Sequence, residues 1–189
     1  CLEIMAMSFA MKVEATSLAG AYRIVPQVHS DTRGEFWRSF CQRNLARNGL
    51  EFEVCQSNVS VNPQRHTLRG FHYQRAPSHE EKILTLMTGA VHLVIVDIRP
   101  DSPTFLAHEA FRFEAGDRSS FLVPHGCATG FLTLTRDTTV HYQMSDYYQP
   151  EHYTGFHYND PSIGVVWPIE PEVVSERDQG FLPLDVSSL

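Results

Sequence analysis

The sequence predicts an all-β protein built as a sandwich or barrel. Short runs rich in β-branched and aromatic residues recur along its 189 residues, and turn-forming residues separate them. The run 91–97 is almost continuously apolar, which is typical of a central strand buried on both faces. The run 138–144 instead alternates, so we expect Thr138, Val140, Tyr142 and Met144 to share one face of a strand.

The expected strands follow one another through most of the chain. They cover residues 21–28, 34–40, 52–61, 83–87, 90–97, 106–113, 120–123 and 138–144. Residues 41–48 look helical and end at Asn48-Gly49, a helix stop signal. The segment after Pro150 is interrupted by prolines, so we expect it to wrap the barrel and to end in a short helical turn near residues 174–180.

Length and composition predict a single domain spanning residues 1–189. Hydrophobic residues make up 42% of the chain and charged residues 20%, which is an ordinary globular composition. No repeat or low-complexity segment divides the chain. We expect residues 1–12, with their three methionines, to be an expression remnant or a disordered N-terminus.

Charge patterning excludes several classes of partner. With 15 basic and 22 acidic residues the formal charge is -7, so the broad basic field that binds nucleic acid is missing. No apolar run approaches the ~18 residues that indicate a membrane span. The N-terminus lacks the basic region of a signal peptide, and we therefore expect a cytoplasmic protein. The four cysteines show no spacing typical of a zinc site or a disulfide framework.

Two glycine-containing blocks are candidates for the chemistry. In residues 68–74, strand alternation predicts that Gly70, His72 and Gln74 share one face, with Arg69, Phe71 and Tyr73 on the other. Together with residues 124–129, this layout resembles the cupin barrels. Metal-binding cupins have histidines where this chain has Gln74 and Thr129, and amide or hydroxyl groups are poor ligands for transition metals. We therefore expect no metal site, which leaves His72 free for acid–base chemistry.

A longer series of stretches resembles the dTDP-4-dehydrorhamnose 3,5-epimerase family in order and spacing, across roughly residues 20–185. These stretches are 33–36, 68–74, Lys82, 97–105, 124–132, 146–152, 159–161 with 167–168, and 175–178. The resemblance implies a cupin-like jelly-roll β-barrel with a few short helices. It also implies a homodimer with exchanged N-terminal strands, no cofactor, and a nucleotide-linked 4-keto-6-deoxyhexose as substrate.

By position in the family, His72 matches the general base and Asp178 its paired carboxylate. Tyr142 matches the acid on the opposite face, and Lys82 the cation near the ketone oxygen. The chemistry is consistent with these types, because inversion needs proton-transfer groups on both faces of a carbon and a cation stabilises an enolate. The resemblance thus implies an isomerase that inverts C3, C5 or both.

Further positions align with the family's substrate-binding set, although the residue type differs at two of them, Arg38 and Thr129. They are Arg33, Phe36, Arg38, Gln56, Asn58, Arg69, Thr129, Tyr148 and Arg177. Arginine suits bidentate phosphate contact, although Arg177 fits a solvated surface arginine equally well. Three positions depart from the family pattern: Arg38 and Tyr153 replace glutamates, and Thr129 replaces a histidine. These departures either redirect substrate preference or are neutral, with Arg38 contacting a phosphate directly.

Other functions stay open at this point. Relatives of this fold include mono-epimerases and 3,4-ketoisomerases that act on related nucleotide sugars. A non-catalytic cupin that binds a sugar nucleotide is a second class, and a metal-dependent cupin oxygenase is a third. Deuterium exchange into the substrate separates an enzyme from a binder, and metal analysis identifies the oxygenase.

Overall fold

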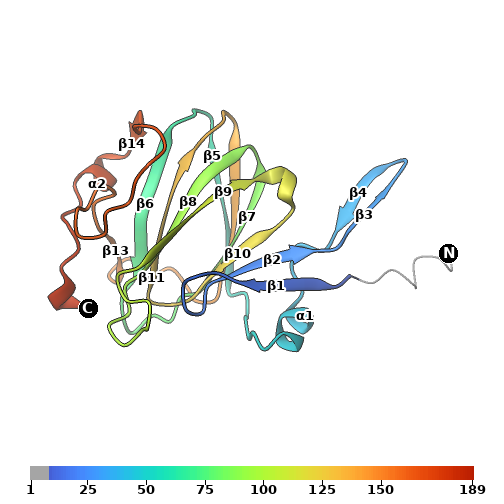
Figure 1. Cartoon of the computed structure of the whole chain (residues 1–189), viewed down its shortest axis with the longest axis horizontal. Coiled ribbons are helices and arrows are strands. Elements are labelled where there is room, and N and C mark those ends of the chain that lie inside the picture. Colours follow the sequence, from blue (N-terminus) through green and yellow to red (C-terminus); the bar gives the residue numbers. More distant parts are fainter. Residues whose placement is uncertain (1–8) are drawn as a thin grey trace.

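The computed structural model describes residues 9–189 as two β-sheets that face each other (Figure 1). The first sheet has the order β1 (Met11–Ala15), β2 (Tyr22–Pro26), β10 (Ser120–Val123), β7 (Lys82–Thr88), β12 (Thr138–Met144) and β5 (Gln56–Asn62). The second has the order β13 (Tyr153–Gly155), β6 (Thr67–Gln74), β11 (Cys127–Thr133), β8 (Ala90–Asp97) and β9 (His108–Glu114), and β14 (Val173–Val174) runs parallel to β6. The all-β prediction is confirmed.

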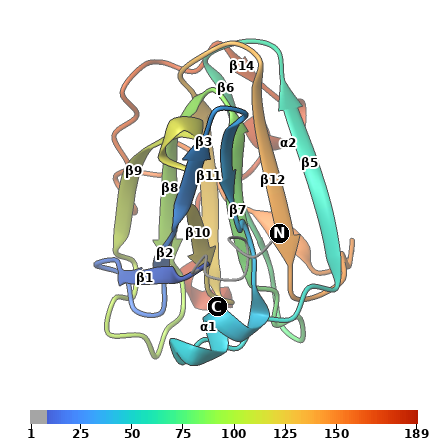
Figure 2. The ribbon, with the colours of Figure 1, turned by 90° about the vertical axis from the view of Figure 1, so that its right-hand side faces the viewer.

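The remaining elements are short. A separate hairpin, β3 (Val28–Asp31) and β4 (Gly34–Trp37), projects beyond the ends of both sheets (Figure 1) and therefore lies in front of them when viewed from that side (Figure 2). The helices are α1 (Gln42–Arg47), α2 (Glu176–Gln179) and the 3-10 turns η2 (Ala115–Asp117) and η3 (Val186–Ser188). In the part of the chain that the structure describes, no helix is long and apolar enough to cross a membrane.

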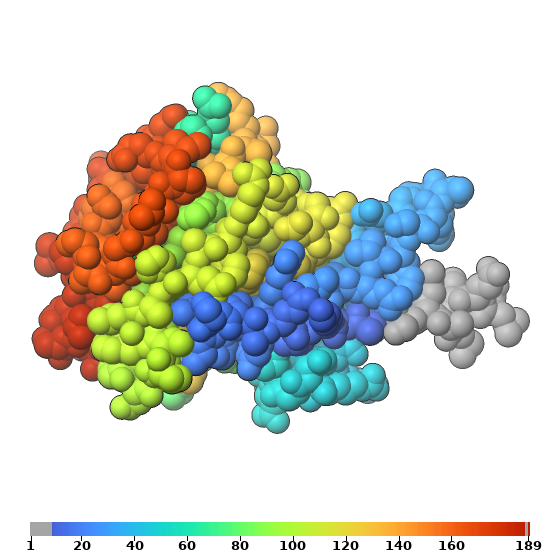
Figure 3. All heavy atoms as spheres, viewed as in Figure 1, coloured from blue at the N-terminus to red at the C-terminus, as the bar shows by residue number. Residues whose placement is uncertain are grey.

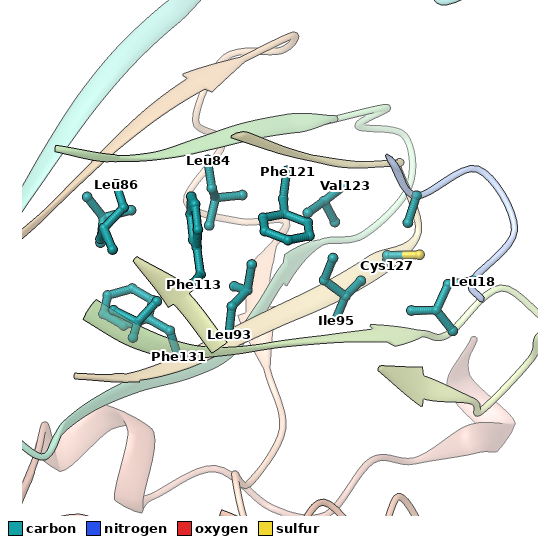
Figure 4. Packing of buried hydrophobic residues seen from close by; sticks show 13 residues of the cluster. Leu18, Leu84, Leu86, Leu93, Ile95, Phe113, Phe121, Val123, Cys127 and Phe131 are labelled. Atoms are coloured by element: carbon teal, nitrogen blue, oxygen red, sulfur yellow. The ribbon is translucent and has the colours of Figure 1, made fainter. Parts of the chain in front are cut away.

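The main hydrophobic core fills the space between the two sheets (Figure 4). Leu84 and Phe121 enter it from the first sheet, and Leu93, Ile95 and Phe131 from the second. A second cluster lies on the outer face of the second sheet, where the C-terminal segment covers it with side chains such as Phe156, Ile163 and Leu184.

Strand β8 has apolar residues on both faces, as its continuous apolar run predicts. Val91, Leu93 and Ile95 belong to the inner core, whereas Val94 and Val96 belong to the outer cluster. Burial of both faces therefore depends on the C-terminal segment, which confirms that this segment wraps the barrel.

Several predicted boundaries need correction. The predicted strand 21–28 is divided at Gln27 into β2 and β3, and the strand predicted over 34–40 ends at Trp37. The predicted N-terminal tail, residues 1–12, is too long, because Met11 is buried and begins β1. Residues 1–8 of that tail lie outside the described residues. The short strands β13 and β14 carry no clear signal, since they lie in the proline-interrupted segment.

The motif 97–105 forms a loop that closes on one buried carboxylate. Asp97 is fully buried and accepts hydrogen bonds from Arg99 Nε at 2.8 Å, Thr104 Oγ1 at 2.6 Å and the Ser102 hydroxyl. Burial raises the pKa of Asp97, but these hydrogen bonds outweigh burial and lower it to about 2. The motif 97–105 therefore has a structural role.

We predict that Asp97→Asn lowers the free energy of unfolding by about 1–3 kcal/mol at pH 7, because buried donors lose their acceptor. The folded-state pKa is depressed, so this stabilisation is present above the ordinary pKa of 3.8 and is lost as pH falls toward 2. Urea denaturation at pH 7 and pH 3 measures the difference. Asp101→Asn, an exposed neighbour in the same loop, is the control. Equal stability of the two variants at pH 7 would contradict this account.

Candidate active site

A cavity of about 370 Å³ opens between the two sheets, beside the main core. Its walls come from β5, β7 and β12 of the first sheet and from β6, β11 and β13 of the second. The lining residues are Gln56, Asn58, Ser60, Arg69, His72, Glu80, Lys82, Leu84, Thr129, Phe131, Tyr142, Met144, Tyr148 and Tyr153. This pocket contains most of the sequence-predicted site residues.

His72 and Asp178 form a hydrogen-bonded pair at the wall made by the second sheet. His72 Nε2 lies 2.8 Å from Asp178 Oδ1, and the backbone N–H of Gly70 donates to Asp178 Oδ2 at 3.0 Å. Burial raises the pKa of Asp178, but the bonds from His72 and Gly70 outweigh it and hold the pKa below its usual value. Because Nε2 is hydrogen-bonded to the ionised carboxylate, Nδ1 of the imidazole is available for proton transfer.

Local sequence explains how Asp178 reaches this position. Ser175 caps α2 by accepting a hydrogen bond from the Asp178 backbone N–H at 3.1 Å, and the carboxylate of Asp178 then meets β6. Gly70 is required at the meeting point, because its φ is +128° and a Cβ would lie 2.4 Å from the Cα of Gly130.

The ladder between β6 and β11 shifts register beside this glycine. His72 lies opposite Thr129, whereas Arg69 lies opposite Phe131. As a result, Arg69 and His72 line the same pocket. The strict alternation expected from the sequence, which puts these two residues on opposite faces, is therefore wrong at this point.

The first sheet contributes Tyr142 and Lys82 to the opposite wall. Tyr142 pairs with Leu84 and Met144 with Lys82, so Lys82 and Tyr142 lie on one face of neighbouring strands, one diagonal apart. Burial raises the pKa of Tyr142, although the charge of Arg69 counteracts part of the effect. Tyr142 thus stays protonated and can donate a proton.

Lys82 is buried rather than solvated. Its side chain is 7% exposed, and Nζ lies 3.0 Å from Glu80 Oε2. A buried ammonium beside a pocket is suited to stabilise negative charge on a bound molecule. The alternative that the residues alone favour, a lysine in solvent after two glutamates, does not hold.

The predicted substrate-binding residues divide into two groups. Gln56, Asn58, Arg69, Thr129 and Tyr148 line the pocket. Arg177 lies behind it, with its guanidinium carbon 4.6 Å from the centre of the Tyr153 ring and Nη2 donating to the Tyr153 carbonyl at 3.2 Å.

The other group lies on or directly after the β3–β4 hairpin, which protrudes from the rest of the molecule (Figure 3) and does not line this pocket. Arg33 pairs with Asp31, Arg38 stacks 4.5 Å over the Phe9 ring, and the Phe36 side chain is largely exposed. Within a single described chain, Arg33, Phe36 and Arg38 therefore do not meet the catalytic candidates.

Six lining residues are absent from the predicted site set, although Tyr153 is one of the departures from the family pattern: Ser60, Glu80, Leu84, Phe131, Met144 and Tyr153. Strand alternation from Lys82 and Tyr142 places Leu84 and Met144 on the same faces, so the sequence could have predicted that these two line the pocket. It could not have predicted Glu80, because the sequence pattern does not distinguish Glu80 from Glu81. Within residues 9–189, no three His, Cys, Asp or Glu side chains are grouped so that they can hold a metal ion.

Comparison with known proteins gives consistent matches over nearly the whole chain. The sequence model described as dTDP-4-dehydrorhamnose 3,5-epimerase matches residues 15–185. A curated dTDP-4-dehydrorhamnose 3,5-epimerase from Methanothermobacter thermautotrophicus is 37% identical over 172 residues, covering 89% of this chain and 92% of the relative. A dTDP-4-dehydro-6-deoxyglucose 3-epimerase from a Streptomyces species is 37% identical over 166 residues, covering 86% of this chain and 84% of the relative.

The fold comparison agrees with the sequence comparison. The crystal structure of dTDP-4-dehydrorhamnose 3,5-epimerase from Bacillus anthracis with TDP and pyrophosphate bound superposes with a TM-score of 0.90 at 35% identity. It covers 93% of this chain and 100% of the other. The predicted cupin-like jelly roll is thereby confirmed. The chain belongs to the dTDP-4-dehydrorhamnose 3,5-epimerase family.

Proposed function

We propose that this protein is an isomerase that inverts C3, C5 or both of a nucleotide-linked 4-keto-6-deoxyhexose, without a cofactor. One observation carries the proposal: His72, which is hydrogen-bonded to Asp178, and Tyr142 enter one pocket from opposite sheets, and buried Lys82 lies in the same pocket. The names of the relatives and the nucleotide bound to the Bacillus anthracis enzyme support this substrate class.

In the proposed reaction, His72 removes a proton from a carbon next to the ketone. The C–H electron pair forms a carbon–carbon double bond, and the carbonyl becomes an enolate whose oxygen is stabilised by the Lys82 ammonium. Tyr142 then donates its phenolic proton to the opposite face of the carbon as the ketone re-forms. Solvent returns the proton to Tyr142 and accepts the one on His72, so the net change is inversion alone.

The nucleotide end of the substrate is assigned to the polar lining of the first sheet and to Arg69. Gln56 and Asn58 offer amide donors and acceptors, and Arg69 offers a planar cation for the diphosphate. Thr129 and Tyr148 complete this binding surface.

We assign the hairpin residues Arg33, Phe36 and Arg38 to the pocket of a second copy. The hairpin projects from its own chain, and Phe36 is 63% exposed although it is a large aromatic side chain. A homodimer that exchanges these strands would cover Phe36 and deliver two arginines to the nucleotide.

A C3-specific epimerase is the second candidate, and Tyr153 is the observation that favours it. Its ring lines the pocket 5.5 Å from the His72 ring and occupies space beside the base. One relative is likewise named as a 3-epimerase. The position of carbon-bound deuterium after reaction in D₂O distinguishes inversion at C3 from inversion at C5.

We predict that His72→Ala or Asp178→Asn lowers kcat by about 10²- to 10⁴-fold, because base catalysis typically contributes that much. Turnover of a 4-keto-6-deoxy sugar nucleotide measures the loss. His141→Ala is the matched control, since His141 lies on the other face of β12, where it contacts Ser57. Near-normal turnover in the His72 variant would exclude this mechanism.

Tyr142→Phe is expected to separate the two halves of the reaction. Phenylalanine keeps the ring in place and deletes the proton donor, so proton removal by His72 continues while inversion slows. NMR in D₂O should show deuterium entering the substrate faster than the epimer accumulates. If exchange and inversion fall together, Tyr142 acts earlier, in enolate formation.

The exchanged-strand dimer predicts complementation between two defective chains. His72→Ala and Arg33→Ala homodimers should each have little activity. When the two variant chains are co-expressed with different tags and pair at random, about half of the dimers are mixed. Each mixed dimer has one intact pocket, so about a quarter of all sites should be active. No recovery in a purified mixed dimer, or a monomer by light scattering, would contradict the assignment.

A further inference from the structure

We propose that Glu80 is a positioning residue that keeps Lys82 charged and directed into the pocket. This inference rests on the proposed function, in which Lys82 stabilises the enolate. It assigns a role to a carboxylate that is not needed as the base, its partner or the acid.

The contact itself is buried on both sides. The Glu80 side chain is 3% exposed and the Lys82 side chain 7%, and Oε2 lies 3.0 Å from Nζ. Removing one partner from a buried ion pair leaves an uncompensated charge, which drives the remaining group to its neutral form. The carboxylate is therefore what allows an ammonium to persist at this depth.

Gln74 holds the other oxygen of the carboxylate. The Gln149 backbone N–H donates to Gln74 Oε1 at 2.7 Å, so the amide nitrogen of Gln74 must face the opposite way. That nitrogen donates to Glu80 Oε1 at 3.2 Å. Oε1 is thus hydrogen-bonded to Gln74, whereas Oε2 faces the Lys82 ammonium in an ion pair without hydrogen-bond geometry.

The charges around Lys82 make Glu80 distinctive. The titratable groups that line the pocket with Lys82 are Arg69 and His72 on β6, Tyr142 on β12, Tyr148, Tyr153 on β13 and Glu80. Among these described groups Glu80 carries the only carboxylate, and Arg69 is a second cation.

The sequence provides an internal reference for a direct test. The chain contains two lysines, and Lys12 is exposed, with 75% of its side chain accessible. A small acylating reagent such as acetic anhydride reacts with neutral amines, and peptide mass spectrometry reports both lysines in one sample. In the unmodified protein we expect that the pH at which Lys82 begins to react is no lower than the pH at which Lys12 begins to react. Reaction of Lys82 at a clearly lower pH than Lys12 would overturn the proposal.

Glu80→Gln should then shift the reactivity of Lys82 to lower pH by about one unit or more, which is about tenfold faster labelling at a fixed pH. Labelling of Lys12 should not change. Glu81→Gln is the matched control, because Glu81 is the next residue along the chain and does not line the pocket. Unchanged Lys82 labelling in folded Glu80→Gln protein would also overturn the proposal.

Kinetics supply the second measurement. Glu80→Gln should lower kcat by about tenfold or more with a smaller effect on KM, and the alkaline limb of the kcat profile should move to lower pH. The kcat of Glu80→Asp, which keeps the charge but shortens the side chain, should lie between the kcat of the unmodified protein and that of Glu80→Gln. If the unmodified protein has no epimerase activity, the proposed function fails, while the labelling comparison still decides the role of Glu80.

Discussion

The contact of Asp178 with β6 is the interaction on which the site depends. The carboxylate binds the Gly70 amide with one oxygen and the His72 imidazole with the other, so it joins helix α2 to the strand that bears His72. The contact fills a gap, because β14 pairs with residues 67–68 and β13 with residues 72–74 of the same strand. The edge of β6 is completed by a functional side chain at the one place where no strand covers it.

The position of α2 follows in turn from hydrophobic burial. The C-terminal segment packs Phe156 and Leu184 onto the outer face of the second sheet, where Phe71 stacks on Phe156 with ring centres 4.9 Å apart. Burial of large side chains contributes roughly 1.5–3 kcal/mol each, so several of them together outweigh one hydrogen bond at the site. The tail is thus ordered by packing, and the orientation of the imidazole is a consequence of that packing.

Sequence reasoning succeeded where chemistry and local periodicity coincide. Alternation along β12 placed Tyr142 on the inward face, and the continuous apolar run of β8 was buried on both sides as predicted. It failed where long-range contacts decide. Arg69 changed faces because the ladder with β11 shifts register, and no local pattern encodes such a shift. The partnership of His72 with Asp178 joins residues 106 positions apart, so only the family resemblance supplied it.

The departures from the family pattern fall into different environments, which separates their consequences. Arg38 directly follows the projecting hairpin and stacks over the Phe9 ring, and it does not line this chain's own pocket. Tyr153 lies in the pocket wall, where burial raises its pKa and Arg177 stacks on its ring. A carboxylate there would add a second negative charge to the pocket that Glu80 lines. A neutral phenol instead lets the Arg177 cation lie over an aromatic face, which leaves Glu80 as the only carboxylate among the described pocket-lining residues.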